Sequence, residues 1–374
     1  MTSAKSNPNR LLVFGTVLLL LSGTEFAQTA FADPLGANTG MTLRMAPDAT
    51  YQDGCFAPCM CPLMMEQPVL GTLKLAYVGF SNSEHSYLVE DVNWYVQGSN
   101  TAERIIGSGK YRIGTPGPIT VIQHRLELDL RVGDDPPAHF DSGWLVLSNS
   151  GGIDILISIN GIFCWDRVMR VHANPVPASD YHRYSLNAGS TFQRGCIDGF
   201  CDCAVGPEYP MQGQFVLVPL QANPLFQLFA AVEVHWRAMS ANSTDGIPIS
   251  GFGLYWVGGE VAVQNRLTLE LKVADEQPQH YDSGMVGGGL QFPLIDIVTR
   301  THTNCVDTLL HVVASPTNGG GQVCGGIAGI PCGAGEFCLL PPGHCCCDFQ
   351  GICTPIGGSC PEYVDLVCAC DGIT

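Results

Sequence analysis

The chain of 374 residues is acidic, with 17 Lys and Arg against 34 Asp and Glu and a formal net charge of −17. This balance argues against nucleic acid and anionic membrane surfaces as partners, because both are bound through basic faces. The length allows two or three domains, and 44 glycines with only 14% charged residues favour short strands joined by turns over long surface helices.

Residues 1–32 have the order of a secretory signal peptide. Two basic residues precede an apolar run from Leu11 to Leu21, and Ala30-Phe31-Ala32 offers small residues at the two positions that a signal peptidase reads. We therefore expect a secreted or extracellular protein, with cell-surface association left open. The run is too short for a confident membrane span and no later stretch is longer, so we expect no transmembrane segment in the mature chain.

One alternating stretch appears twice, as HRLELDLRVGDDPPAHFDSG at 124–143 and as NRLTLELKVADEQPQHYDSG at 265–284. Apolar and polar residues alternate with period two over eight residues in each copy, which indicates a β-strand with one buried face. Other landmarks, such as Cys164 and Cys305, are also 141 residues apart. The pattern predicts a duplicated domain of about 120 residues, too long a period for a solenoid repeat.

The repeats divide the chain into segments that differ in composition. We expect a signal peptide at 1–32, an N-terminal arm at 33–53, a first β repeat at 54–175, a linker at 176–194, a second β repeat at 195–316, a Gly-rich linker at 317–323 and a Cys-rich tail at 324–374. The predicted fold is all-β, with two homologous antiparallel β-sandwich or β-barrel domains in tandem and a small disulfide-rich tail. The sequence leaves sandwich and barrel open.

The strands expected in the first copy are short and separated by turns. They cover 71–80, 87–96, 111–113, 119–132, 144–147, 153–159 and 167–172. In the sixth of them, isoleucines recur at every second position from Ile153 to Ile159, and Asp154 and Ser158 are expected to be among the residues that face outward. After the alternating stretch, the chain is expected to turn and resume as a strand at the aromatic residue before Asp141.

Each repeat opens with a cluster of three cysteines and closes with a single one. The two sets are Cys55, Cys59, Cys61 and Cys164, and Cys196, Cys201, Cys203 and Cys305. An exported chain favours disulfides, and an even number allows two within each domain. At least one should join the entry segment to the last strands, because Cys59 and Cys61 are too near to pair comfortably. A zinc or iron–sulfur site is the alternative, but the clusters lack C-x2-C spacing.

The His-aromatic-Asp-Ser-Gly pentad suggests a catalytic triad, but its members are nearly adjacent, whereas a nucleophile, base and orienting acid converge from separate segments. A turn explains it better, with Asp and Ser accepting local backbone hydrogen bonds and Gly supplying the permissive dihedral. A weaker alternative is calcium binding by oxygens of neighbouring loops. Its candidate ligands are Asp134, Asp135, Asp141, Asp275, Glu276 and Asp282. We expect no cofactor and no catalytic residue.

The tryptophans could stack on sugar rings, although a tryptophan on an alternating strand is more often part of the core. Trp94 and Trp236 recur at one position of the repeat, which favours core. Trp144 and Trp256 have no matching tryptophan and are freer to lie at the surface. Residues 242–244 form an N-glycosylation sequon, meaningful in a eukaryotic secretory pathway.

The tail reads CGGIAGIPCGAGEFC from Cys324, then CCC at 345–347, then CTPIGGSCPEYVDLVCACDGIT. Residues 353–374 resemble the first half of a Kazal-type serine protease inhibitor domain. Cys360 and Cys368 have the spacing of that family's second and third cysteines, and the final residues resemble its C-x-x-D-G-x-T motif. The segment before it is similar to the cysteine hairpins of follistatin-like proteins. The further tail cysteines expected in disulfides are Cys324, Cys332, Cys338 and Cys353.

The resemblance implies a reactive bond between Glu362 and Tyr363, two residues after the second cysteine. In this family a convex loop held by disulfides fits the protease cleft at little entropic cost. The sequence given stops at Thr374, before the tyrosine and three cysteines with which the family continues. We therefore expect a partial inhibitor segment whose family bridges lack partners.

These observations predict an exported, non-catalytic interaction protein whose tail, in a complete form, inhibits a serine protease. The partner expected is a serine protease or another extracellular protein. The alternative is a protein whose β-domains bind carbohydrate or a cell surface. An enzyme is the weakest hypothesis, because no separated nucleophile, base and orienting residue is visible.

Overall fold

A computed structural model of the protein describes residues 40–317 and short parts of the tail. The gaps are at 61–64, 99–102, 117–120, 149–150, 198–203, 223–224, 240–245, 260–261, 288–291 and 304–305, and the tail is described at 323–325, 331, 336–339 and 350–355. In this part of the chain, no helix has the length and apolar character that crossing a membrane requires. The expected signal peptide, the sequon and the Glu362–Tyr363 bond lie outside the described residues.

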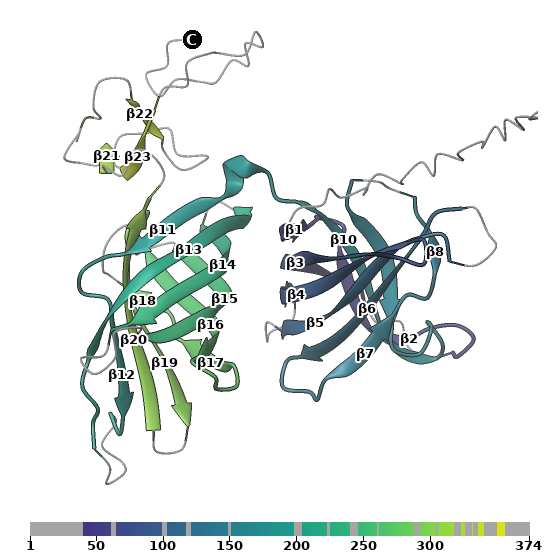
Figure 1. Ribbon diagram of the computed structural model, residues 1–374, viewed down its shortest axis with the longest axis horizontal. Coiled ribbons are helices and arrows are strands. Elements are labelled where there is room, and N and C mark those ends of the chain that lie inside the picture. The colour runs from purple at the N-terminus through teal and green to yellow at the C-terminus, as the bar shows by residue number, and fades with distance from the viewer. Residues whose placement is uncertain are drawn as a thin grey trace, which may run out of the picture.

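The described chain is almost entirely β-structure, as predicted, in two antiparallel sheets of ten strands each (Figure 1). The first sheet contains β1 (Met41–Met45), β2 (Thr50–Cys55), β3 (Gln67–Ser81), β4 (Glu84–Val96), β5 (Glu103–Gly114), β6 (Gln123–Val132), β7 (Ala138–Asp141), β8 (Leu145–Val146), β9 (Ile153–Ser158) and β10 (Trp165–Pro175). A short 3-10 helix, η1 (Ala178–Asp180), leads to the second sheet.

The second sheet contains β11 (His182–Leu186), β12 (Thr191–Gly195), β13 (Tyr209–Ala222), β14 (Phe226–Ala238), β15 (Ile247–Gly258), β16 (Gln264–Val273), β17 (Gln279–Asp282), β18 (Val286–Gly287), β19 (Ile295–Thr303) and β20 (Val306–Pro316). Its strand order repeats that of the first sheet, each strand matching the one ten numbers earlier. Leu43 on β1 pairs with Leu73 and Pro175, and Tyr184 on β11 pairs with Phe215 and Pro316 at matching positions. The duplication read in the sequence is therefore a duplication of the fold.

Each sheet closes on itself, which decides between the two architectures left open by the sequence. In the first, hydrogen bonding runs from β3 through β4, β5, β6, β7 and β9 to β10. The successive pieces β1 and β2 then lie between β10 and β3 and complete the ring. Both domains are thus barrels, in which closure removes exposed sheet edges.

The domain boundaries expected from the sequence need correction. The supposed N-terminal arm at 33–53 supplies β1 and most of β2, and the supposed linker at 176–194 supplies β11 and most of β12. These short strands have little periodicity of their own. They are β-structure because their neighbours β3 and β10, or β13 and β20, offer backbone groups on both sides.

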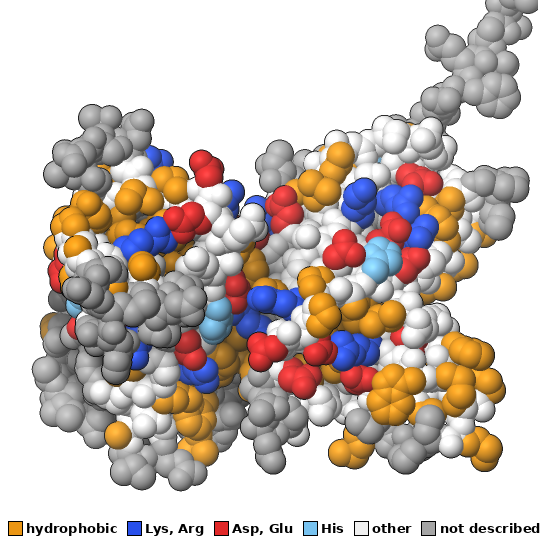
Figure 2. Space-filling model, turned by 90° about the horizontal axis from the view of Figure 1, so that it is seen from below, with side chains coloured by type: hydrophobic (Ala, Val, Ile, Leu, Met, Phe, Trp, Pro, Cys, Tyr) orange, Lys and Arg blue, Asp and Glu red, His pale blue; other side chains and the backbone are white. Residues whose placement is uncertain are grey.

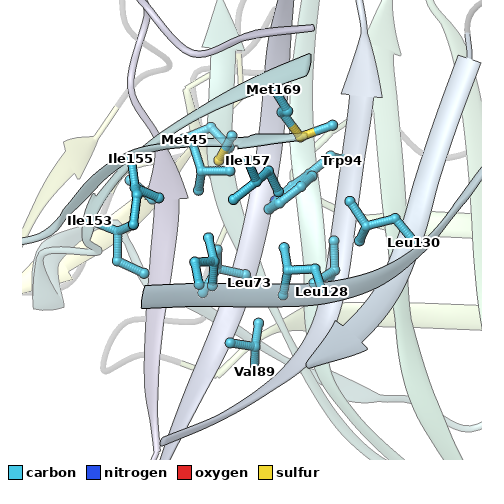
Figure 3. Close-up of a cluster of buried hydrophobic side chains, with 14 of the residues drawn as sticks. Met45, Leu73, Val89, Trp94, Leu128, Leu130, Ile153, Ile155, Ile157 and Met169 are labelled. Carbon is cyan, nitrogen blue, oxygen red and sulfur yellow. The ribbon is translucent and has the colours of Figure 1, made fainter. Parts of the chain in front are cut away.

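The core of each barrel is built from the inward half of every alternating strand. In the first, Leu126, Leu128 and Leu130 are fully buried, and side chains from β1, β3, β4 and β9 pack against this row (Figure 3). Burying one such leucine contributes about 1.5–3 kcal/mol. Trp94 and Trp236 lie in the two cores, 0% and 4% exposed, as their shared position predicted.

One strand is far longer than the sequence indicates: β5 spans 103–114, whereas only 111–113 were expected. Glycines at 107 and 109 weaken the strand pattern. A Cβ at Gly107 would lie 2.1 Å from the carbonyl oxygen of Asp129 on β6, so the close approach of the two strands requires glycine.

The tail forms a separate three-stranded sheet from β21 (Val323–Gly325), β22 (Glu336–Leu339) and β23 (Gln350–Pro355). β23 lies between the other two, and the Cα atoms of Cys338 and Cys353 are register partners. The segment that resembles a Kazal domain lies almost wholly outside the described residues. The resemblance therefore stays a prediction.

Candidate functional site

One end of the first barrel carries a group of large apolar side chains that face solvent. Phe163 and Trp165 are each 59% exposed, Ile162 is 39% exposed and Met60 is fully exposed. We call these four residues the apolar tip. All lie within two residues of the disulfide between Cys59 and Cys164. Figure 2 shows hydrophobic side chains gathered at the lower right of the right-hand barrel.

Asp166, which is 2% exposed, organises the connection between β9 and β10 that carries most of the tip. Its carboxylate accepts hydrogen bonds from four backbone N–H groups, those of Ile159, Asn160, Ile162 and Arg167, at 2.7–3.1 Å. A buried carboxylate that accepts this many donors fixes the backbone around it. The backbone of the turn is therefore fixed by the buried carboxylate of Asp166.

The disulfide fastens the turn to the segment that follows β2, and the backbone N–H of Phe56 donates to the carbonyl oxygen of Cys164 at 2.8 Å. Ile162 has φ of 63° and Cys164 has φ of 53°. Positive φ is costly for a β-branched residue, and such strain persists only where surrounding contacts impose it. The tip is thus a preorganised display of apolar side chains.

An arginine and several carboxylates line the end of the barrel beside the tip, which we call the barrel mouth. Arg167 donates from Nε to Asp53 at 3.0 Å and from Nη2 to Asp135 at 2.6 Å. Glu103 is the cross-strand partner of Val96, a core residue, so the side chain of Glu103 also points toward the barrel interior. The pKa of Tyr51 is raised by its burial and further by the charges of Asp53, Glu103 and Asp135, against the lowering effect of Arg167.

The second barrel closes the same end with different residues. Arg194, on the strand that matches β2, forms two hydrogen bonds of 2.7 Å to Glu276 and one of 3.2 Å to Thr308. Thr308 occupies the place of Arg167, and Ile247 that of Glu103. The arginine thus lies on β12, the counterpart of β2, and not on β20, the counterpart of β10. In the second mouth, the charge of this one arginine is matched by the charge of Glu276.

The apolar tip has no counterpart in the second copy. Aligning the cysteines places Asp202 at the position of Met60, Thr303 at Ile162, Asn304 at Phe163 and Val306 at Trp165. Every replacement is polar or smaller, although the flanking Cys and Asp are kept. The tip is therefore specific to the first barrel and is not required for the fold.

One disulfide is present between two of the cysteines expected to pair within the first barrel. Cys59 and Cys164 form a disulfide between the entry segment and the last strands, 105 residues apart. Cys55 and Cys196 are also disulfide-bonded. The cysteines at 61, 201, 203 and 305 lie outside the described residues, as do most of the tail cysteines.

The pentad forms the predicted turn in both copies. Asp141 Oδ1 accepts the backbone N–H of Gly143 at 2.8 Å, Ser142 Oγ accepts that of Leu126 at 3.0 Å, and Gly143 has φ of 62°. Asp141 also accepts two bonds from Arg125, at 2.9 and 2.6 Å, which hold the pKa of this carboxyl below its usual value. The same contacts recur in the second copy, where Arg266 binds Asp282.

Four of the six calcium candidates are bound to arginine. Asp135 pairs with Arg167, Asp141 with Arg125, Glu276 with Arg194 and Asp282 with Arg266. Asp134 and Asp275 are exposed at the equivalent β6–β7 and β16–β17 turns. Within the described ranges, no three His, Cys, Asp or Glu side chains are placed to hold a metal ion.

The two unmatched tryptophans are partly buried, each with an arginine over its ring. The guanidinium of Arg112 lies 5.2 Å from the centre of Trp144, and that of Arg266 lies 5.6 Å from the centre of Trp256. Tyr95 of the first barrel meets Trp256 edge-on at 5.9 Å. One ring face of each is thus occupied, which favours a structural role.

A second polar cluster joins the barrels. Arg104 Nη1 donates to Glu270 Oε1 at 2.9 Å, and His280 Nδ1 lies 2.8 Å from the same oxygen. Asn93, fully buried, donates to the carbonyl oxygen of Gly253 at 2.7 Å. Burial raises the pKa of Glu270, but the hydrogen bond from His280 and the charge of Arg104 outweigh it, so the pKa lies below its usual value. The cluster is a contact between domains.

The alternating pattern does not predict the apolar tip. It predicts that Ile159 faces inward and Ser158 outward, but β9 ends at Ser158, which is 5% exposed, while Ile159 is 37% exposed in the turn. Phe163 and Trp165 lie outside the pattern. The signal that finds them is the difference between the copies beside Cys164 and Cys305.

The fold and site define a two-barrel, all-β protein with an exposed, disulfide-held apolar loop on one barrel. Comparisons with protein-family models, with curated proteins and with solved structures find no match to this chain.

Proposed function

We propose that the chain is an exported, non-catalytic interaction protein that binds another protein through the apolar tip of its first barrel. The observation that carries the proposal is the exposure of Phe163 and Trp165 on a turn held rigid by Asp166 and the disulfide. Tryptophan and other large apolar residues supply much of the energy of protein interfaces. A rigid turn loses little entropy on binding.

The composition of the tip favours a protein over a carbohydrate partner. Sugar sites commonly pair one flat ring with surrounding hydrogen-bonding groups, whereas Ile162 and Met60 add aliphatic and flexible surface beside the rings. Methionine adapts well to protein partners. An exposed apolar surface rimmed by polar residues marks a protein interaction site more often than a solvated end of a barrel.

Random linear peptides displayed on phage, selected against the full chain, test the proposal. The key variant carries the residues of the second copy: Ile162→Thr, Phe163→Asn and Trp165→Val. We expect selected peptides to lose at least tenfold in affinity for this variant, because it truncates two aromatic anchors. Its thermal unfolding should stay within a few degrees of the parent, because the replaced side chains are exposed and Asp166 holds the turn through backbone N–H groups.

The matched control replaces exposed apolar residues at the opposite end of the same barrel, with Val78→Thr and Phe80→Asn; these side chains are 62% and 56% exposed. Binding should be unchanged. Peptides that bind the tip variant as well as the parent would contradict the proposal. So would a glycan array signal that disappears with the tip variant, which would favour carbohydrate.

A further inference from the structure

The charges beside the tip indicate which protein surface fits it. We propose that the partner segment presents an apolar anchor flanked by lysine or arginine, so that the anchor packs on the tip and the cation approaches the acidic barrel mouth. The inference rests on the proposed function and names the chemistry of its partner.

The first mouth has an excess of negative charge. Asp53, Glu103 and Asp135 face one arginine, Arg167, which binds only the first and last of these carboxylates. The carboxylates are accessible, since the side chains of Asp53 and Asp135 are 32% and 50% exposed. Asp134 is exposed on the same turn. The mouth therefore attracts cations.

Trp165 and the mouth belong to one surface. Trp165 and Arg167 are alternate residues of β10, so their side chains leave the same face of the strand, next to Cys55 and Asp53 on β2. A partner that covers Trp165 thus places its flanking residues beside Arg167 and its carboxylates.

The second copy shows that both features changed together. Its mouth pairs Arg194 with Glu276 and has Ile247 in place of Glu103, so the excess of negative charge is smaller there, with Asp275 as the one unbalanced carboxylate among the matching positions. Its tip positions are polar or smaller. Apolar surface and the larger negative charge thus coincide on the barrel where a partner is proposed.

The selected peptides provide the test. We expect lysine and arginine next to an aromatic or aliphatic anchor in their sequences. Affinity should fall about three- to fivefold with Glu103→Gln and with Asp134→Asn, the range for partly exposed charge pairs. It should also fall on raising NaCl from about 50 to about 500 mM. Asp275→Asn, the matching exposed position in the second barrel, should change nothing.

The outcomes separate this inference from the proposed function. Peptides that need the tip but carry no cationic residues, or whose affinity ignores salt and both neutralising variants, would overturn the inference and leave the proposed function standing. Peptides that bind regardless of the tip would overturn both.

Discussion

The disulfide between Cys59 and Cys164 gives the most quantitative prediction. The double variant Cys59→Ser and Cys164→Ser removes a cross-link between residues 105 apart without creating an odd thiol. Closing a loop of that length raises the free energy of the unfolded chain by about 4.7 kcal/mol, because it lowers the chain's entropy. For a barrel of about 135 residues, each kcal/mol corresponds to roughly 3–5 °C, so the first barrel should melt about 15–20 °C lower.

Hydrogen exchange followed by mass spectrometry assigns the loss to a domain. Amides of β6 in the first barrel should lose protection, and those of β16 in the second should change little. The variant Phe80→Asn, at the far end, serves as control. A fall below about 5 °C with β6 protection unchanged would refute the reasoning, because the bridge would then not restrict the unfolded first barrel.

The same double variant tests whether the disulfide between Cys59 and Cys164 preorganises the tip. Measured well below its melting temperature, it should bind tip-specific peptides roughly five- to tenfold more weakly, because the turn must then be ordered on binding.

The remaining predictions concern the pentad, the interdomain contact and the tail. Asp141→Ala should destabilise the first barrel by about 1–2 kcal/mol in chemical denaturation, since it removes the hydrogen bonds that Arg125 and the backbone N–H of Gly143 donate to this carboxylate, while tip binding at low temperature should persist; a rise in melting temperature with micromolar calcium would contradict this account. The pKa of Glu270 lies below its ordinary value of 4.5, so the stability that this carboxylate contributes is present above pH 4.5 and is lost as the pH falls through the folded-state pKa. Glu270→Gln should therefore flatten the acid limb of the curve of stability against pH. Equal acid limbs for variant and parent would count against the contact. We propose, from the resemblance of the tail to a Kazal domain, that Glu362 sets inhibitor specificity, so the tail should inhibit trypsin poorly and favour a glutamate-specific protease; tight trypsin inhibition would contradict this.

The alternating strands could be predicted because period two reports burial directly. Leu126, Leu128 and Leu130 are buried where the pattern placed them, and Asp141 accepts the backbone N–H of Gly143 two residues later. These features depend on neighbours in the chain, so the sequence contains the information in one window. The bond from Leu126 to Ser142 spans 16 residues and depends on the pairing of β6 with β7.

Closure of the sheets could not be predicted, because it depends on β1 and β2 lying between β3 and β10, strands distant in sequence. Exposure of the tip was missed for a related reason. Phe163 and Trp165 are ordinary core residues by type, but Phe163 lies in the turn that the disulfide and Asp166 hold, and Trp165 begins β10 at the end of the barrel, so neither reaches the core. An apolar residue next to a cysteine gives no sign of which way it faces.

The two copies have diverged on their surfaces while keeping their cores. On one outer face of the first barrel, Lys74 and Glu90 form an exposed ion pair. The matching positions on β13 and β14 are Val216 and Val232, 2% and 6% exposed, in an apolar cluster with Val176 at the end of the first domain.

At this apolar cluster the second barrel meets the first barrel and η1, and its Glu270 also binds Arg104. The first barrel has a charged pair on the matching outer face and exposed apolar side chains at its mouth. Differences between equivalent surfaces of the two copies point to contacts that only one copy makes. The buried differences lie at the contact between the barrels, and the exposed difference at Trp165 lies where we propose that a partner binds.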